Sequence, residues 1–136
     1  MNNFIFENSS KVYFGEGCVK EYLSSILSAY GDTVMLCYGG GSIKKNGIYD
    51  EVITVLKKEN KTVVEFCGIP SNPTYSKVLA GVKLAKESNA DLILAVGGGS
   101  VMDCCKAISL GAKYDGDIWA DFWARPGVID FEPLPL

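Results

Sequence analysis

The chain has 136 residues, of which 48% are hydrophobic and 21% charged, a composition typical of one globular domain with its own core. A formal net charge of −3 and a pI near 4.9 provide no basic field, which argues against nucleic acid as a partner. No run of about 18 apolar residues occurs, and the five cysteines have no C-x-x-C spacing, so we expect reduced thiols, no membrane contact and a cytoplasmic location.

The N-terminal third of the chain shows one helix pattern and one strand pattern. Residues 4–14 alternate in character and predict a strand or hairpin. Apolar side chains then recur at helical spacing over residues 19–30, which predicts an amphipathic helix closed by Gly31. The continuous apolar run 33–38 predicts a strand that is buried on both faces, as in a parallel sheet.

The same alternation continues through the next part of the chain. Helical periodicity over residues 48–56 leads to a strand pattern at 62–66, and periodicity over 75–85 leads to a second strand pattern at 92–96. A fourth helix is expected from Met102 to about Ala112. Because strands that begin about thirty residues apart match βαβ units, we predict an α/β fold with a Rossmann-like open parallel sheet and helices on both faces.

Beyond residue 112 the periodic pattern fades. Trp119 and Trp123 are four residues apart, which favours one helical face and leaves open that the face is buried against a partner domain. The chain ends on the apolar, proline-bounded segment 133–136. Such segments usually lead into something that buries them, so we expect a truncated chain.

The tetrapeptide Gly-Gly-Gly-Ser occurs twice, at residues 39–42 and 97–100, each time between a predicted strand and a predicted helix. Without side chains, backbone N–H groups at a helix start are free to bind phosphate. The alternative is that both are only tight turns. Neither copy fits the G-x-G-x-x-G or P-loop patterns. What favours binding is the pair, since the carboxyl ends of parallel strands share one edge, where a single dinucleotide would contact both turns.

Other polar residues near these turns have two interpretations each. The spacing of Ser100 and Asp103 matches a capping box, in which Asp103 serves the helix start; alternatively, Asp103 faces a neutral nicotinamide carboxamide. Asn72 or Thr74 is expected to cap the third helix, with ligand contact by Asn72 as a secondary role.

The first turn also bears on the choice of cofactor. Residues 38–45 contain no acid and include Ser42, Lys44 and Lys45. A free ribose diol usually meets an acidic acceptor, whereas a 2′-phosphate meets small residues and cations, so the segment favours NADP, with NAD as the alternative. The lysines are otherwise solvated surface charges.

Three ordered motifs, YGGGSIKKNG at 38–47, GIPSNP at 68–73 and AVGGGSVMD at 95–103, resemble the iron-containing alcohol dehydrogenases, closest to their NADP-preferring butanol dehydrogenase or aldehyde reductase branch. The resemblance implies that the second turn binds the pyrophosphate, that Asp103 lies near the nicotinamide, and that the first turn surrounds the adenosine ribose. The candidate cofactor-binding residues are Gly39, Gly40, Gly41, Ser42, Lys44, Asn72, Gly97, Gly98, Gly99, Ser100 and Asp103.

The resemblance also implies what this chain lacks. The family holds Fe²⁺ or another divalent metal with one aspartate and three histidines in a C-terminal helical domain, and this chain has no histidine. We therefore expect residues 1–136 to be the dinucleotide-binding domain alone, with no catalytic or metal-binding residue and no turnover. The implied full-length enzyme, a homodimer, transfers hydride between NADP(H) and a small alcohol or aldehyde. Alternatives are a non-catalytic nucleotide- or phosphate-binding module, or a folded domain whose cleft is too open to bind.

Overall fold

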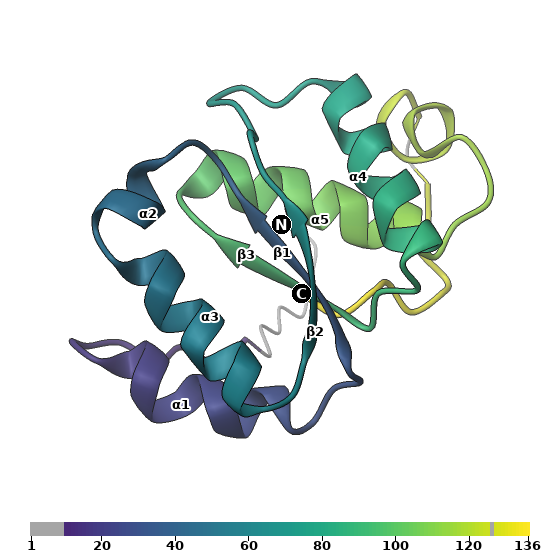
Figure 1. Cartoon of the computed structure of the whole chain (residues 1–136). Helices are drawn as coiled ribbons and strands as arrows, with labels where there is room; N and C mark the ends of the chain where they lie inside the picture. The colour runs from purple at the N-terminus through teal and green to yellow at the C-terminus, as the bar shows by residue number, and fades with distance from the viewer. Residues whose placement is uncertain (1–9, 126) are drawn as a thin grey trace, which may run out of the picture.

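The computed structural model describes residues 10–125 and 127–136, and a parallel sheet lies at its centre (Figure 1). Its strands are β1 (Thr33–Tyr38), β2 (Thr62–Phe66) and β3 (Leu92–Val96). They run in the order β2-β1-β3, with both neighbours parallel to β1. All three coincide with the strands predicted at residues 33–38, 62–66 and 92–96, so the α/β fold with a parallel sheet is confirmed.

Helices cover both faces of the sheet, as predicted (Figure 1). On one face lie α1 (Cys18–Leu27) and α3 (Ile48–Lys58), and on the other α4 (Tyr75–Glu87) and α5 (Gly99–Ala112). Two short elements complete the described chain. These are α2 (Ser42–Lys45) and a single π turn, η1 (Trp119–Trp123).

The central strand β1 supplies side chains to both cores. Because successive side chains of a strand point to opposite faces, Leu36 packs with the α1 and α3 side while Met35 and Cys37 pack with the α4 and α5 side. Every residue from 34 to 38 is at most 3% exposed. Burial on both faces explains why this strand is a continuous apolar run rather than an alternating one.

The first predicted helix is too long at its C-terminal end. It ends at Leu27 rather than beside Gly31, and the chain leaves it through two turn hydrogen bonds, Ala29 N–H to Ile26 and Tyr30 N–H to Leu27. Gly31 is needed for a different reason: a methyl group there would lie 2.4 Å from Cγ of Asp91. The strand or hairpin predicted for residues 4–14 falls largely outside the described residues, and 10–14 form no strand.

The apolar C-terminal segment returns to the sheet. Leu134 is 2% exposed, and its N–H donates to the carbonyl of Ser109 in α5 at 3.0 Å. The N–H of Ile93 in β3 donates to the carbonyl of Pro135 at 2.8 Å. The segment therefore lies along α5 and β3.

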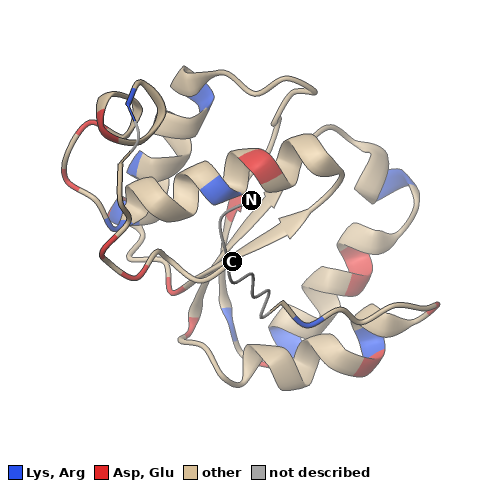
Figure 2. Cartoon of the chain, turned by 180° about the vertical axis from the view of Figure 1, so that it is seen from behind, with Lys and Arg blue, Asp and Glu red and all other residues tan. Residues whose placement is uncertain are grey.

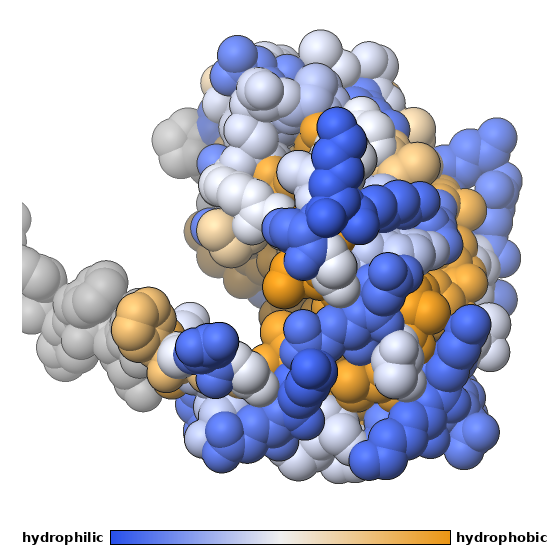
Figure 3. Space-filling model, turned by 60° about the vertical axis from the view of Figure 1, so that its left-hand side comes forward, coloured by the Kyte–Doolittle hydropathy of each residue, from blue (hydrophilic) through white to orange (hydrophobic). Residues whose placement is uncertain are grey.

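The surface of the described part is mixed in charge. Figure 2 shows acidic and basic residues interspersed over the helices of one face, without a continuous basic area. Figure 3 shows polar side chains over much of another face, with apolar surface between them. None of the described helices is long and apolar enough to cross a bilayer.

Because β1 is buried on both faces, a leucine in this strand should contribute more to stability than an exposed leucine on a helix. Leu36 is 0% exposed, and Leu36→Ala should lower the free energy of unfolding by about 2–5 kcal/mol, because it leaves a cavity enclosed by sheet and helices. Leu79 in α4 is 45% exposed, so Leu79→Ala should cost less than about 1 kcal/mol. Urea unfolding of both variants measures the difference, and equal losses would contradict this packing.

Candidate cofactor site

The two glycine turns lie side by side at the carboxyl edge of the sheet. Residues 39–42 follow β1 and residues 97–100 follow β3, and the last residues of these strands, Tyr38 and Val96, are register partners. The chain passes from β1 to β2 through α3 on one face and from β2 to β3 through α4 on the other. The strand order thus reverses between β1 and β3, the place where open α/β sheets bind ligands.

A third loop joins the two turns. The N–H of Gly68 donates to the carbonyl of Gly39 at 2.9 Å, which ties the loop after β2 to the first turn. The hydroxyl of Ser100 donates to the carbonyl of Ser71, which ties the same loop to the start of α5. These bonds fix the relative positions of three loops that come from three different strands.

The glycines of the turns are not required by backbone conformation. None of the six has a positive φ, and two of them illustrate this: φ is −80° at Gly41 and −86° at Gly98. Ordinary residues adopt such values, so the tight-turn explanation does not account for these glycines.

Crowding explains only the first glycine of each turn. A methyl group at Gly39 would lie 3.1 Å from the carbonyl oxygen of Ile69, and one at Gly97 would lie 2.6 Å from a methyl of Val101. At the other four positions a methyl group would meet no non-neighbouring atom of the described chain within 4 Å; these are Gly40, Gly41, Gly98 and Gly99. We refer to these four as the open glycines. They leave bare backbone facing free space.

The start of α5 has free hydrogen-bond donors. Its N-cap is Gly98, which has no side chain to cap the helix, and the carbonyl of Gly98 accepts from Val101 and Met102. Within the described part of the chain, the N–H groups of Gly99 and Ser100 have no acceptor. A helix of 14 residues adds a positive partial charge at this end, so the turn has the chemistry of an anion site.

The predicted capping box is wrong. Because α5 begins at Gly99 instead of near Met102, Ser100 lies inside the first turn and Asp103 lies beyond it. Asp103 bonds no helix-start amide; its side chain is 74% exposed and forms an ion pair with Lys106 at 3.6 Å. The helix-start role of Asp103 is therefore also wrong.

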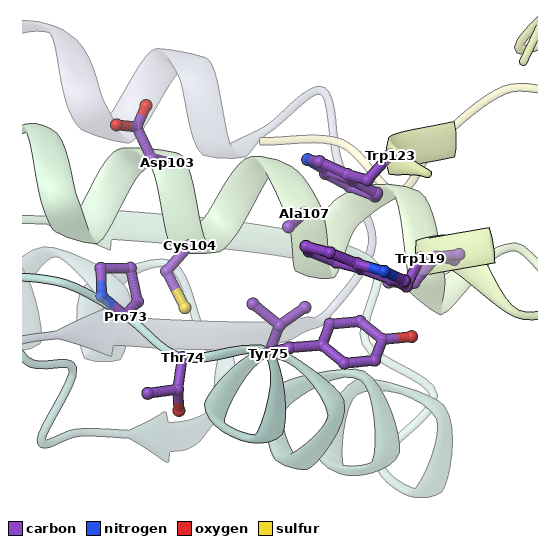
Figure 4. A pocket seen from close by; sticks show the side chains of 10 residues that line it. Pro73, Thr74, Tyr75, Asp103, Cys104, Ala107, Trp119 and Trp123 are labelled. Carbon is purple, nitrogen blue, oxygen red and sulfur yellow. The ribbon is translucent and has the colours of Figure 1, made fainter. Parts of the chain in front are cut away.

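Asp103 contributes instead to a cavity of about 190 Å³ between α5, the start of α4 and η1. Figure 4 shows the rings of Trp119 and Trp123 one above the other on one side of this cavity, as their spacing predicted, with Pro73 near its opposite end. Both tryptophans are about half exposed, at 51% and 50%. The cavity thus has an apolar, aromatic lining with one carboxylate.

The loop before α4 shows which of Asn72 and Thr74 caps this helix. Thr74 is the N-cap of α4, where its hydroxyl oxygen accepts from the N–H of Lys77 at 3.3 Å. Asn72 is exposed and has no such role. It stays a candidate ligand contact through its place between Ser71 and Pro73, at the junction of the third loop and the cavity.

The first turn leads into a polar cluster that the sequence did not reveal. The hydroxyls of Tyr38 and Tyr49 donate to the two carboxylate oxygens of Glu65, each at 2.5 Å. The ammonium of Lys44 lies 4.5 Å from the ring centre of Tyr49 and 5.3 Å from that of Tyr38. We call these four residues the Glu65 cluster. Glu65 is the one acid in the β2 run TVVEF, which was the available signal.

The cluster keeps Glu65 ionised. The hydrogen bonds from Tyr38 and Tyr49 hold the pKa of the Glu65 carboxyl below its usual range. The hydrogen bond from Tyr49 to Glu65 raises the pKa of Tyr49 to about 12. Burial and the hydrogen bond to Glu65 raise the pKa of Tyr38. At neutral pH the carboxylate is negative and both tyrosines remain donors.

The described residues do not fit an iron site. The chain has no histidine, and among residues 10–125 and 127–136 no three cysteine, aspartate or glutamate side chains gather around a common point. Iron prefers imidazole, carboxylate or thiolate ligands gathered in one place.

Comparison with known proteins identifies the family. A sequence model described as iron-containing alcohol dehydrogenase matches residues 9–136, and the chain belongs to this family. A probable NADH-dependent butanol dehydrogenase 1 of Bacillus subtilis is 55% identical over 119 residues, which are 88% of this chain and 30% of that protein. The NADPH-dependent aldehyde reductase YqhD of Escherichia coli is 40% identical over 118 residues, 87% of this chain and 30% of that protein.

Solved structures agree with the sequence comparison. The NADH-dependent butanol dehydrogenase A of Thermotoga maritima has a TM-score of 0.81 and 45% identity, covering 90% of this chain and 31% of that one. A substrate- and cofactor-free form of YqhD has a TM-score of 0.78 and 36% identity, covering 90% of this chain and 32% of that one. The fold is therefore the Rossmann-like one that the sequence predicted, and the chain spans about a third of the length of these relatives.

Proposed function

We propose that this chain binds a nicotinamide dinucleotide across its two glycine turns, as the cofactor-binding part of an iron-containing alcohol dehydrogenase. The pyrophosphate would occupy the turn at residues 97–100 and the adenosine ribose the turn at residues 39–42. The observation that carries the proposal is the four open glycines, which neither backbone strain nor crowding explains. The free amides of Gly99 and Ser100 support the position of the pyrophosphate.

The nicotinamide end of the cofactor would point toward the aromatic cavity. Asp103 and Pro73, which follows Asn72 in the chain, line this cavity together with Trp119 and Trp123. A neutral carboxamide beside Asp103 avoids the repulsion that a phosphate would meet there. In this arrangement the chain's own residues bind and orient the cofactor.

The reaction itself is proposed for the whole enzyme. Relatives are named as butanol dehydrogenases and an aldehyde reductase, which supports reversible hydride transfer between NAD(P)H and a small alcohol or aldehyde. Since the chain has no histidine and its described residues do not fit a metal site, we propose that iron or another divalent metal is bound by a further, helical domain. Assembly as a homodimer and a cytoplasmic location stay predictions from the sequence.

The choice between NADP and NAD is balanced in this chain. Ser42, Lys44 and Lys45 favour a 2′-phosphate, as the sequence predicted. The negative charge of Glu65, which bonds Tyr38 beside the first turn, would repel a 2′-phosphate. Relatives at 55%, 49% and 43% identity are named as NADH-dependent. The NADPH-dependent aldehyde reductase is 40% identical. We therefore propose that the chain accepts both dinucleotides.

Blocking one open glycine should abolish tight binding without loss of the fold. Gly98→Val places a branched side chain over the proposed pyrophosphate position, so the Kd for NADH and NADPH should rise at least about tenfold. The protein offers free space for that side chain, so the unfolding midpoint should stay close to that of the parent. Calorimetric titration and thermal melting measure the two quantities.

The matched control for this variant is Ala29→Val, on the exposed turn after α1. It adds the same kind of surface side chain away from both glycine turns and should leave both Kd values unchanged. If Gly98→Val binds the dinucleotides as tightly as the parent does, the phosphates do not bind at the turn formed by residues 97–100. Equal binding of inorganic phosphate and dinucleotide would instead favour a non-catalytic phosphate-binding module.

The purified 136-residue chain should show no turnover. With butyraldehyde and either NADH or NADPH, and with added Fe²⁺, absorbance at the reduced-nicotinamide band should stay constant, because the chain has no histidine and no metal-binding cluster occurs in its described part. A protein-dependent rate of cofactor oxidation would show that catalysis does not need a further domain.

A further inference from the structure

We propose that Glu65 determines the balance between NADH and NADPH, by holding the two tyrosines on which Lys44 rests and by repelling a 2′-phosphate at the first glycine turn. The inference rests on the proposed function, since it assumes that the adenosine ribose lies at residues 39–42. It assigns Glu65 as a specificity-determining residue for that site.

The position of the Glu65 cluster relative to the first turn supports this role. Tyr38 immediately precedes Gly39, and Lys44 lies in α2, which begins at the last residue of the turn. Glu65 is on the neighbouring strand β2, one residue before its carboxyl end. The cluster therefore flanks the turn from both of its ends in the sequence and from the adjacent strand in space.

The contacts show that Lys44 is already engaged. Its ammonium rests on the faces of Tyr49 and Tyr38, at 4.5 and 5.3 Å from the ring centres. Both of these tyrosines are fixed through their hydroxyls to Glu65. The positive charge of Lys44 also lowers the pKa of the Glu65 carboxyl. A lysine held in this way is less available to a phosphate than a solvated one.

The charges give the sign of the effect. A 2′-phosphate carries about −1.5 to −2 charges at neutral pH, whereas the free ribose of NADH carries none. The negative charge of Glu65 therefore weakens NADPH binding and leaves NADH binding nearly unchanged. Removing that charge should also release Lys44 toward the phosphate. Both consequences raise the affinity for NADPH relative to NADH, whichever cofactor the parent prefers.

The size of the effect follows from exposure. Glu65 and Lys44 are both exposed, and charge interactions at exposed sites change affinities by roughly threefold to tenfold rather than by orders of magnitude. They are also screened by salt, with a Debye length of about 10 Å at 0.1 M. The shift in preference should accordingly shrink as ionic strength rises.

The test is calorimetric titration of the 136-residue chain with NADPH and NADH at low ionic strength, for the parent and three variants. Glu65→Gln should lower the Kd for NADPH about threefold to tenfold with little change for NADH. Glu65→Asp keeps the charge and should retain the parental ratio. Glu59→Gln removes the same charge after α3, where Glu59 bonds Ser24, and is the matched control.

Selective change is what separates specificity from structural damage, since a distorted turn would weaken both dinucleotides. A Glu65→Gln variant whose NADPH-to-NADH ratio stays within about twofold of the parent overturns the inference while the proposed function stands. A parent chain that binds neither dinucleotide overturns the proposed function, and the inference with it. Equal shifts in Glu65→Gln and Glu59→Gln would show that only net charge matters and also overturn it.

Discussion

The structure depends on the parallel pairing of β1 with β2 on one side and β3 on the other. This pairing buries the side chains of residues 34–38 alternately in two cores, which fixes the register of all three strands. Because β1 and β3 end together, the turns that follow them are adjacent although they are 58 residues apart in the sequence. The candidate site is a consequence of that register.

Two kinds of glycine occur in the turns, and only one kind serves the fold. Gly39 and Gly97 permit close approach of Ile69 and Val101, whereas the open glycines contact nothing in the described chain. Glycine costs more conformational entropy on folding than any other residue, so glycines that give the fold no contact are explained best by a ligand that needs bare amides. We propose that the choice between NADH and NADPH depends on the neighbouring Glu65 cluster, which has charged side chains.

The sequence predicted most of the fold because its signals are local. Short strand patterns located β1, β2 and β3 correctly, and helical periodicity located α3 and α4 within two residues at most. The start of α5 was missed because its N-cap is Gly98, which has no capping side chain, while Ser100 and Asp103 imitate a capping box further on. The two turns were predicted as a site, but Glu65 was not, because it meets Tyr38 across 27 residues of chain and only strand pairing joins them.

Nuclear magnetic resonance of the ¹⁵N-labelled chain can show whether the bare amides of the two turns bind the phosphates of a dinucleotide. On addition of NADH, the amide signals of Gly40, Gly41, Gly99 and Ser100 should shift and reach saturation. Amide signals from the turn after α1, which lies at the amino end of β1 and away from the glycine turns, should not shift. Saturable shifts confined to other residues, with these four amide signals unmoved, would mean that the phosphates do not bind at the glycine turns.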